Sequence, residues 1–284
     1  MQVTFWGTRG SIPSPGPQTA RYGGNTSCVE VRLDEGTRLI FDAGTGLRVL
    51  GSELMAQSDP VEAHLFLTHM HWDHIQGLPF FTPAFFNNTE LTIQGPEEQH
   101  LSLEQILCDQ MRRPYYPIPM HTMTAKIDFN PLTEGSVHHI GGATIEVCFL
   151  NHPGTTLGYR LSAEDKVLVY ATDNEPFGAD PTSQHLVRPS RLLDLAHEAD
   201  LLIQDAQYTP DEYPQRLGWG HSTYIDALML ARQAKVKRLA LYHHDPSHDD
   251  RQIDGIVAKS AAWIQTENAA FTFFAAVEGE TLTL

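Results

Sequence analysis

The stretch THMHWDHIQG, residues 68 to 77, gathers three histidines and an aspartate into six consecutive positions. It directly follows the apolar run Leu65-Phe66-Leu67, which is typical of a buried strand. A packed turn has no need of such a cluster. Because neutral imidazole and carboxylate are the usual protein ligands of zinc, the cluster predicts a metal site at the end of a strand. The candidate ligands are His69, His71, Asp73 and His74.

Further candidate ligands stand at the ends of other apolar runs. His152 follows the run that ends at Leu150, Asp173 comes just beyond VLVY, and His243 directly follows LALY. A core histidine would lie within such a run, and a solvated histidine would not recur at strand ends. The repeated position therefore favours one metal site assembled from several strand ends.

Composition restricts the partners of the chain. Of its 284 residues, 35 are acidic and 19 are lysine or arginine, which gives a formal charge of −16. Such a surface repels a long nucleic acid, whose binding needs clustered cations, so none is expected as a partner. A small anion could still bind where local cations reverse the sign.

Cysteine usage and hydropathy bear on location. Cys28, Cys108 and Cys148 are far apart and in no CxxC spacing, which argues against disulfides and thiolate metal sites. The start of the chain has no basic segment, and no apolar run approaches ~18 residues, so we expect neither a signal peptide nor a membrane span. A cytoplasmic location is predicted.

Strand-like and helical patterns alternate along the chain, and strands dominate its first half. Helices are expected over 46–57, 222–236 and 247–264, with Ser222 capping the second and Asp245 or Ser247 capping the third. The pattern predicts one domain over 1–284, built as a two-layer sheet sandwich flanked by helices. The expected strands are 3–6, 28–33, 38–41, 63–67, 91–93, 144–150, 157–161, 167–170, 201–203, 239–242 and 270–274.

Two stretches lack a clear period. Residues 9–24 read as a Gly/Pro-rich loop, and residues 100–135 read as an irregular excursion. The excursion is either a plain connection or a lid or homodimer contact, and both interpretations stay open.

The ligand pattern as a whole, with His152, Asp173 and His243, resembles the metallo-β-lactamase superfamily, an αββα sandwich with a two-metal cleft. The resemblance runs from FWGTRGS near the start to YHHDPSHDD near residue 250. It implies one ion on His69, His71 and His152, and a second on Asp73, His74 and His243. Asp173, together with a water or hydroxide, would bridge two divalent ions, with zinc favoured and manganese the alternative.

The resemblance also implies a reaction class. Position 71 is histidine where the oxygen-reducing diiron branch has glutamate, which favours hydrolysis over redox chemistry. Two zinc ions with Asp73, Asp173 and a bridging hydroxide would leave a pocket of about +1, which attracts a compact anion. Asp73 is thereby counted among the catalytic residues.

Two further stretches resemble the phosphodiesterase branch that includes ribonuclease Z. His221 in GWGHST precedes a predicted helix, and Asp205 in LLIQDAQ follows a predicted strand. The resemblance implies that His221 protonates the departing alkoxide and that Asp205 orients the imidazole of His221. Position 205 departs from the glutamate of ribonuclease Z. The alternative is that His221 only packs beside the helix start.

Within that branch, the sequence favours a small substrate over transfer RNA. No Gly- and Lys-rich insertion lies between 152 and 243, and residues 5–31 resemble small-substrate phosphodiesterases. Arg9 and Arg21 would contact phosphate or make structural salt bridges. His244 would support the site or the substrate, or have only a structural role. Ordinary surface or loop positions are expected for His121, His138, His139 and His248.

The sequence therefore predicts a metal-dependent phosphodiesterase acting on a small cyclic phosphodiester, with a 3′,5′-cyclic nucleotide favoured. Alternatives are a phosphoribosyl cyclic phosphodiesterase, a lactonase, thioesterase or β-lactamase, or an RNA-processing nuclease. A non-catalytic metal- or nucleotide-binding sensor is the alternative from another class. In the excursion, Arg112, Arg113, Tyr115 and Tyr116 would cover the base or mediate a dimer.

Overall fold

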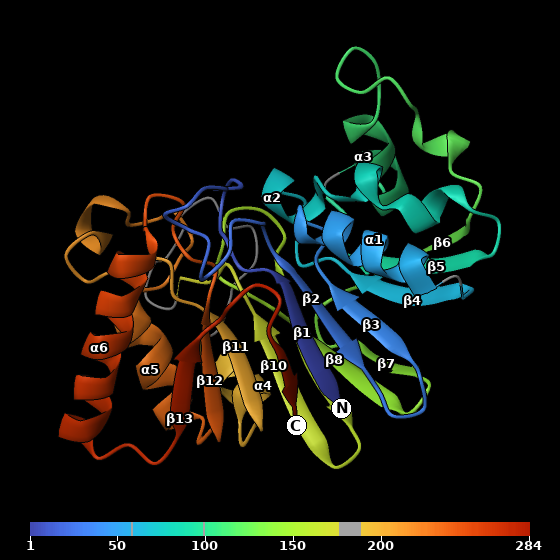
Figure 1. The fold of residues 1–284 in the computed structure, drawn as a ribbon. Coiled ribbons are helices and arrows are strands. Elements are labelled where there is room, and N and C mark those ends of the chain that lie inside the picture. Colours follow the sequence, from blue (N-terminus) through green and yellow to red (C-terminus); the bar gives the residue numbers. More distant parts are fainter. Residues whose placement is uncertain (58, 99, 176–188) are drawn as a thin grey trace.

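Two seven-stranded sheets pack face to face in the computed structural model, which describes residues 1–57, 59–98, 100–175 and 189–284 (Figure 1). The first sheet has the order β14 (Thr281–Thr283), β1 (Gln2–Gly7), β2 (Cys28–Arg32), β3 (Arg38–Phe41), β4 (Val61–Phe66), β5 (Thr89–Gly95) and β6 (Lys126–Pro131). The second has the order β13 (Thr272–Ala275), β12 (Arg238–Tyr242), β11 (Leu201–Asp205), β10 (Lys166–Ala171), β9 (Leu157–Ala163), β8 (Ala143–Phe149) and β7 (Val137–Ile140).

Each sheet is antiparallel in one part and parallel in the other. Strands β3 to β6 pair in parallel in the first sheet, and β10 to β13 do so in the second. Parallel strands end at a common edge of their sheet, so the residues that follow them gather there. This topology brings the ends of β4, β10 and β12 together.

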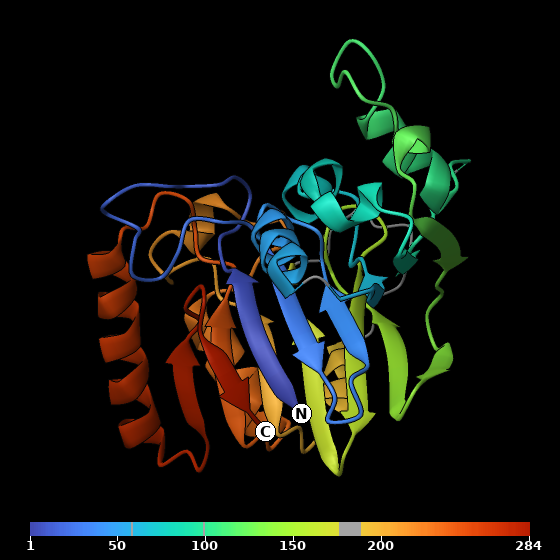
Figure 2. The same ribbon diagram turned by 45° about the vertical axis from the view of Figure 1, so that its right-hand side comes forward.

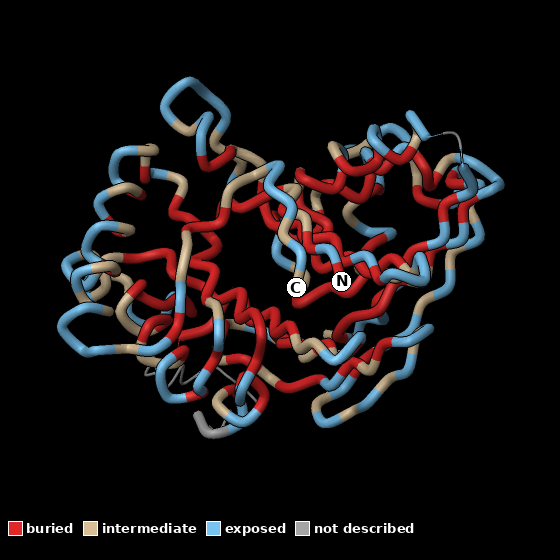
Figure 3. Tube along the Cα trace, turned by 60° about the horizontal axis from the view of Figure 1, so that its bottom comes forward, coloured by how far each residue is buried: buried red, intermediate tan, exposed pale blue. Residues whose placement is uncertain are grey.

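Aromatic side chains from both sheets pack against one another in the core between them. Phe41 and Phe66 stack with ring centroids 5.4 Å apart, and Tyr159 and Tyr170 contact the ring of Phe41 from the opposite sheet. All four side chains are fully buried. Figure 3 shows buried backbone running through the middle of the molecule, with exposed segments at its periphery.

Helices cover the outer faces of both sheets, which confirms the predicted αββα sandwich. Leu47, Leu50 and Leu54 of α1 (Gly46–Gln57) pack in the core outside the first sheet, with α3 (Leu103–Gln110) beside them. Three helices pack outside the second sheet, namely α4 (Pro189–Ala196), α5 (Tyr224–Gln233) and α6 (Asp250–Glu267).

Residues 100–135 are more regular than predicted. They contain α3 and β6, and a 3₁₀ turn at Met120–Thr122. The eight residues of α3 are too few for a clear helical period, although Ser102 caps the helix and Leu103 and Leu107 are buried. The segment after α3 projects from the body of the molecule (Figure 2). Its role as a lid or dimer contact stays a prediction.

Both predicted helix caps were wrong by one or more residues. Thr223, not Ser222, caps α5, because the Ser222 hydroxyl donates inward to the carbonyl of Asn174. Asp249 caps α6, because the Asp245 carboxylate is already bonded to Ser247. The predictions also omitted α4, β7 and β14.

Candidate metal centre

All seven predicted metal ligands lie at one end of the sandwich. His69 and His71 follow β4, and Asp73 and His74 lie in the short helix α2 (Trp72–Ile75). The remaining three residues, His152, Asp173 and His243, follow β8, β10 and β12. Each side chain is buried except that of His71.

The ligand atoms form two groups that could each hold a metal ion, and within each group they lie within 4.8 Å of one another. The first group is His69, His71 and His152, and the His152 Nε2 lies 3.1 Å from the His71 Nδ1. The second is Asp73, His74, Asp173 and His243.

Asp173 lies between the two groups. Its Oδ1 is 3.9 Å from the Nε2 atoms of both His69 and His152. Its Oδ2 is 3.2 Å from His74 Nε2 and 3.3 Å from His243 Nε2. One carboxylate therefore offers one oxygen to each group, so Asp173 could contact an ion held by either group.

The charge states of His69, His152 and Asp173 also suit metal binding. Burial lowers the pKa of His69 well below its usual value and that of His152 to about 3, so both imidazoles are neutral. Burial raises the pKa of Asp173, but nearby histidines, His243 first, outweigh that effect and hold it well below the usual value. Neutral imidazole and ionised carboxylate are the forms that ligate divalent metals.

Two imidazole nitrogens in the cluster are buried without a hydrogen-bond partner in the described part of the chain. They are His69 Nε2 and His74 Nε2. An unpaired buried polar atom is costly, whereas one metal ion in each group would satisfy the two nitrogens. The donor set and these unpaired atoms therefore fit divalent metal ions.

Groups that the sequence analysis missed hold the far nitrogen of several of these rings. His74 Nδ1 contacts Asp42 Oδ2 at 2.8 Å, and His243 Nδ1 donates to Gln207 Oε1 at 2.8 Å. His152 Nδ1 donates to the carbonyl of Gly220 at 2.9 Å. Such partners fix the tautomer and orientation of a ligating imidazole. For Asp42 a sequence signal was available, since it directly follows β3 just as candidate ligands follow β4, β8, β10 and β12.

The backbone turns sharply at three of these positions. Asp42, Asp173 and His243 have φ values of 62°, 56° and 62°. Left-handed backbone is uncommon for residues other than glycine and clusters at functional sites. Here it ends β3, β10 and β12 at the point where each side chain must face the cleft.

His221 and Asp205 form a second buried pair beside the ligands. His221 Nδ1 lies 2.7 Å from Asp205 Oδ2, and the His221 ring stacks on that of His243 at 5.1 Å. Burial lowers the pKa of His221, but Asp205 outweighs burial and raises it to about 9. Asp205 also accepts from the backbone N–H groups of Gln207 and Ser222, so its carboxylate is fixed.

The other polar residues considered from sequence have structural partners. Arg9 is buried and donates to the carbonyls of Gly23, Asp245 and His248, while Arg21 pairs with Asp254. His244 Nε2 donates to the carbonyl of Ala276. His248 lies in a loop, which is one of the two positions expected for it.

The side chain of His248 is buried and bonds to Glu212, because the loop before α6 folds inward, where the His248 carbonyl accepts from Arg9. By contrast, His121 is exposed, while His138 and His139 lie on the edge strand β7.

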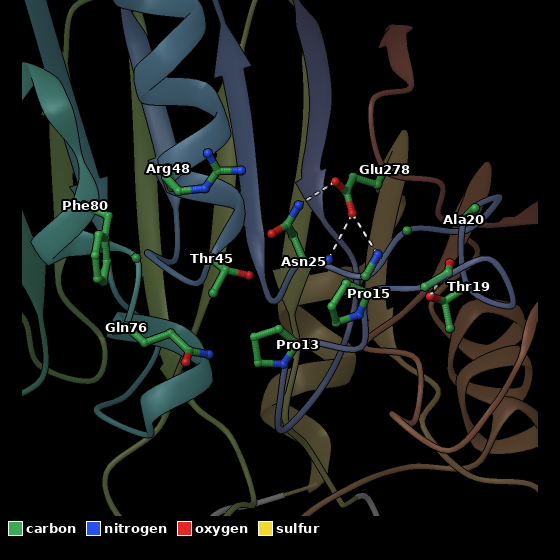
Figure 4. Close-up of a pocket in the computed structure, with 14 residues that line it drawn as sticks. Pro13, Pro15, Thr19, Ala20, Asn25, Thr45, Arg48, Gln76, Phe80 and Glu278 are labelled. Atoms are coloured by element: carbon green, nitrogen blue, oxygen red, sulfur yellow. Dashed lines mark hydrogen bonds between the residues drawn. The ribbon is translucent and has the colours of Figure 1, made fainter.

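A cavity of about 610 Å³ lies beside α2 (Figure 4). It lies between the Gly/Pro-rich loop and the start of α1, and Gln76 and Gly77 in its wall directly follow the α2 segment that carries Asp73 and His74. Arg48, Thr45 and Asn25 give it a polar side.

Residues 37–244 match the family model described as "Beta-lactamase superfamily domain". The chain belongs to this superfamily and is a hydrolase of the metallo-β-lactamase fold. Within it, the chain falls in the phosphodiesterase branch. It is 30% identical to "Ribonuclease Z" of Haloferax volcanii over 277 residues, which cover 86% of this chain and 84% of the relative.

Solved structures share the fold over the full length. The metallo-β-lactamase fold protein YhfI from Bacillus subtilis superposes with a TM-score of 0.69 at 18% identity, covering 99% of this chain and 98% of that one. Unliganded yeast PDE1 gives 0.68 at 14% identity, covering 100% and 99%. No helix in the described ranges is long and apolar enough to cross a membrane.

Proposed function

We propose that the chain is a two-metal phosphodiesterase that hydrolyses a small cyclic phosphodiester, with a 3′,5′-cyclic nucleotide as the favoured substrate. The observation that carries this proposal is the His221–Asp205 pair, 2.7 Å apart and packed against His243 of the ligand cluster. A hydrolase that expels a good leaving group, such as a thiolate, does not need such a proton donor.

In this proposal, His69, His71 and His152 hold one ion, Asp73, His74 and His243 hold the other, and Asp173 contacts both. Zinc is the favoured metal, with manganese the alternative. Two bound ions would supply an activated water and would neutralise charge on the phosphoryl oxygens.

The protein's own part is to deliver a proton. In the proposal, His221 would give up the proton on its Nε2, while Asp205 accepts from its Nδ1 and holds the ring in place. Cleavage of a cyclic phosphodiester releases a sugar alkoxide, which is a poor leaving group. A positioned acid is worth roughly 10²–10⁴-fold in rate at such a step.

Size and charge favour a small substrate. The cavity beside α2, at about 610 Å³, is in the range of small-molecule sites and has room for a nucleoside. The formal charge of −16 disfavours a long polyanion.

A substrate screen tests the proposal. Metal-loaded protein would be assayed against 3′,5′-cyclic AMP, 3′,5′-cyclic GMP, ribose cyclic phosphate, bis-p-nitrophenyl phosphate, a lactone and a thioester. We expect a cyclic nucleotide to give the highest kcat/KM. Preferred turnover of the lactone or thioester, unaffected by His221→Ala, would contradict it, and so would tight nucleotide binding without turnover.

RNA cleavage is the second candidate, because the similarity to Haloferax ribonuclease Z extends over most of both chains. A transfer RNA precursor with a 3′ extension is the substrate to test. Cleavage of that precursor with a higher kcat/KM than any cyclic nucleotide would favour this candidate over the first.

A further inference from the structure

One buried carboxylate, that of Glu175, holds the loop between β11 and α5 in place through hydrogen bonds. Glu175, which is 1% exposed, accepts from the Tyr213 hydroxyl at 2.6 Å and from the backbone N–H of Gly220 at 2.9 Å. It also accepts from the N–H of Gly218. The carbonyl of Gly220 in turn accepts from His152. The loop therefore has a fixed position relative to the candidate metal centre.

This loop presents an arginine, Arg216, that pairs with no carboxylate in the described part of the chain. The Arg216 guanidinium lies over the Trp219 ring at 4.7 Å and over the Tyr208 ring at 5.7 Å. Across the described residues, it forms no ion pair. Aromatic stacking holds the planar group in place while leaving its N–H fork available.

Arg216 is adjacent to the reacting groups through its two aromatic partners. The Tyr208 ring packs edge-on against the ring of His221 at 5.8 Å. Trp219 stands two residues before His221 and is 53% exposed. The guanidinium is thus separated from the proton donor by a single aromatic ring, that of Tyr208.

We propose that Arg216 binds the anionic phosphate of the substrate and so determines specificity for phosphodiesters over uncharged esters. A guanidinium fork matches the geometry of phosphate oxygens and can form two parallel hydrogen bonds with them. In a protein of formal charge −16, an unpaired cation at this position adds local attraction for a compact anion. The inference rests on the proposed phosphodiesterase function.

The test compares Arg216→Gln with Arg238→Gln in metal-loaded protein. Arg238 is a matched control, because it also stacks on a ring, that of Phe274, but lies at the opposite end of β12 from His243. For bis-p-nitrophenyl phosphate we expect Arg216→Gln to raise KM about tenfold and to change kcat less than about twofold, because the lost contact binds substrate and transition state alike. Arg238→Gln should leave both unchanged.

A binding measurement separates this inference from the proposed function. By titration calorimetry, Arg216→Gln should weaken the binding of inorganic phosphate about tenfold, at unchanged metal content, and Arg216→Lys should recover part of the loss. Equal phosphate affinity in Arg216→Gln and Arg238→Gln would overturn the role of Arg216. Absence of phosphodiester turnover in the unmodified protein would instead overturn the proposed function, while the phosphate titration would still decide the role of Arg216.

Discussion

Asp205 shows how much a single carboxylate can determine. One oxygen orients the imidazole of His221, while the other accepts two backbone N–H groups, from Gln207 and Ser222. Aspartate is shorter than the glutamate of ribonuclease Z at this position. Asp205 still reaches His221, because it is the last residue of β11 and its side chain lies next to the histidine.

Replacing Asp205 with asparagine should therefore separate substrates by leaving group. Asparagine keeps the size of the side chain but removes the charge that keeps His221 protonated. We expect kcat for a cyclic nucleotide to fall about 100-fold, and kcat for bis-p-nitrophenyl phosphate, whose leaving group needs no proton, to fall less than about threefold. Steady-state kinetics on both substrates would measure this. Asp226→Asn is the control, and an equal loss on both substrates would rule out proton donation.

A substitution at Gly220 would test the three-histidine group, because Gly220 packs directly against His152. Its φ is 84°, and an added Cβ would lie 2.2 Å from His152 Nδ1. Gly220→Ala should displace His152 and lower bound metal from about two ions per chain to about one, by elemental analysis. Gly218→Ala is a matched control, since Gly218 has φ 80° with open space around it. Two ions retained by Gly220→Ala would argue against His152 as a ligand.

At this scale, sequence predicted the residues that carry distinctive chemistry at strand ends. The candidate ligands and Asp205 were accessible because histidine and aspartate at or just after strand ends have few structural uses, and His221 was accessible from its place before a predicted helix. Gln207 and Glu175 were not accessible. Their roles depend on which ring nitrogen or backbone N–H lies opposite, and those partners are 36 to 45 residues away in the sequence.

Among the elements, those with a strong period or continuous apolar composition were predicted, and the weak ones were missed. The strand β7 alternates exposed and half-buried residues at a sheet edge, so its pattern is indistinct. Helix α5 was found, but its cap was placed one residue early. Sequence cannot separate Ser222 from Thr223 as a cap, because the choice depends on whether the Ser222 hydroxyl has an inward partner.

The cap of α5 can be tested directly. Thr223 and Asp226 form a capping box, in which each side chain bonds to the backbone N–H of the other residue. Thr223→Ala should lower the free energy of unfolding by about 1 kcal/mol, measured by urea denaturation. Thr266→Ala, near the end of α6, should cost much less, because that hydroxyl only bonds back to Ala262 within its helix. A smaller loss for Thr223→Ala than for Thr266→Ala would contradict the assigned cap.

For the whole molecule, the candidate metal centre joins the two sheets. The β4 side supplies four of its residues from the first sheet, and β8, β10 and β12 supply the others from the second. Without ions, buried imidazoles and carboxylates face one another across this junction with unpaired atoms such as His69 Nε2. Sequence predicted this convergence only through candidate ligands that recur at strand ends and through the family resemblance, since the packing of one sheet on the other is set by side chains far from the site.

Removing metal should therefore destabilise the entire fold rather than one loop. A ligand that binds only the native state at about 1,000 times its Kd adds about 4 kcal/mol, which corresponds to a Tm shift on the order of 10 °C in a chain of this size. We expect chelator-treated protein to unfold at a Tm lower by that order, in one cooperative calorimetric transition, and zinc to restore the original Tm. In His243→Ala, which keeps the three-histidine group, the shift should be smaller. An unchanged Tm after complete metal removal would mean that the ligand residues do not couple the two sheets through bound ions.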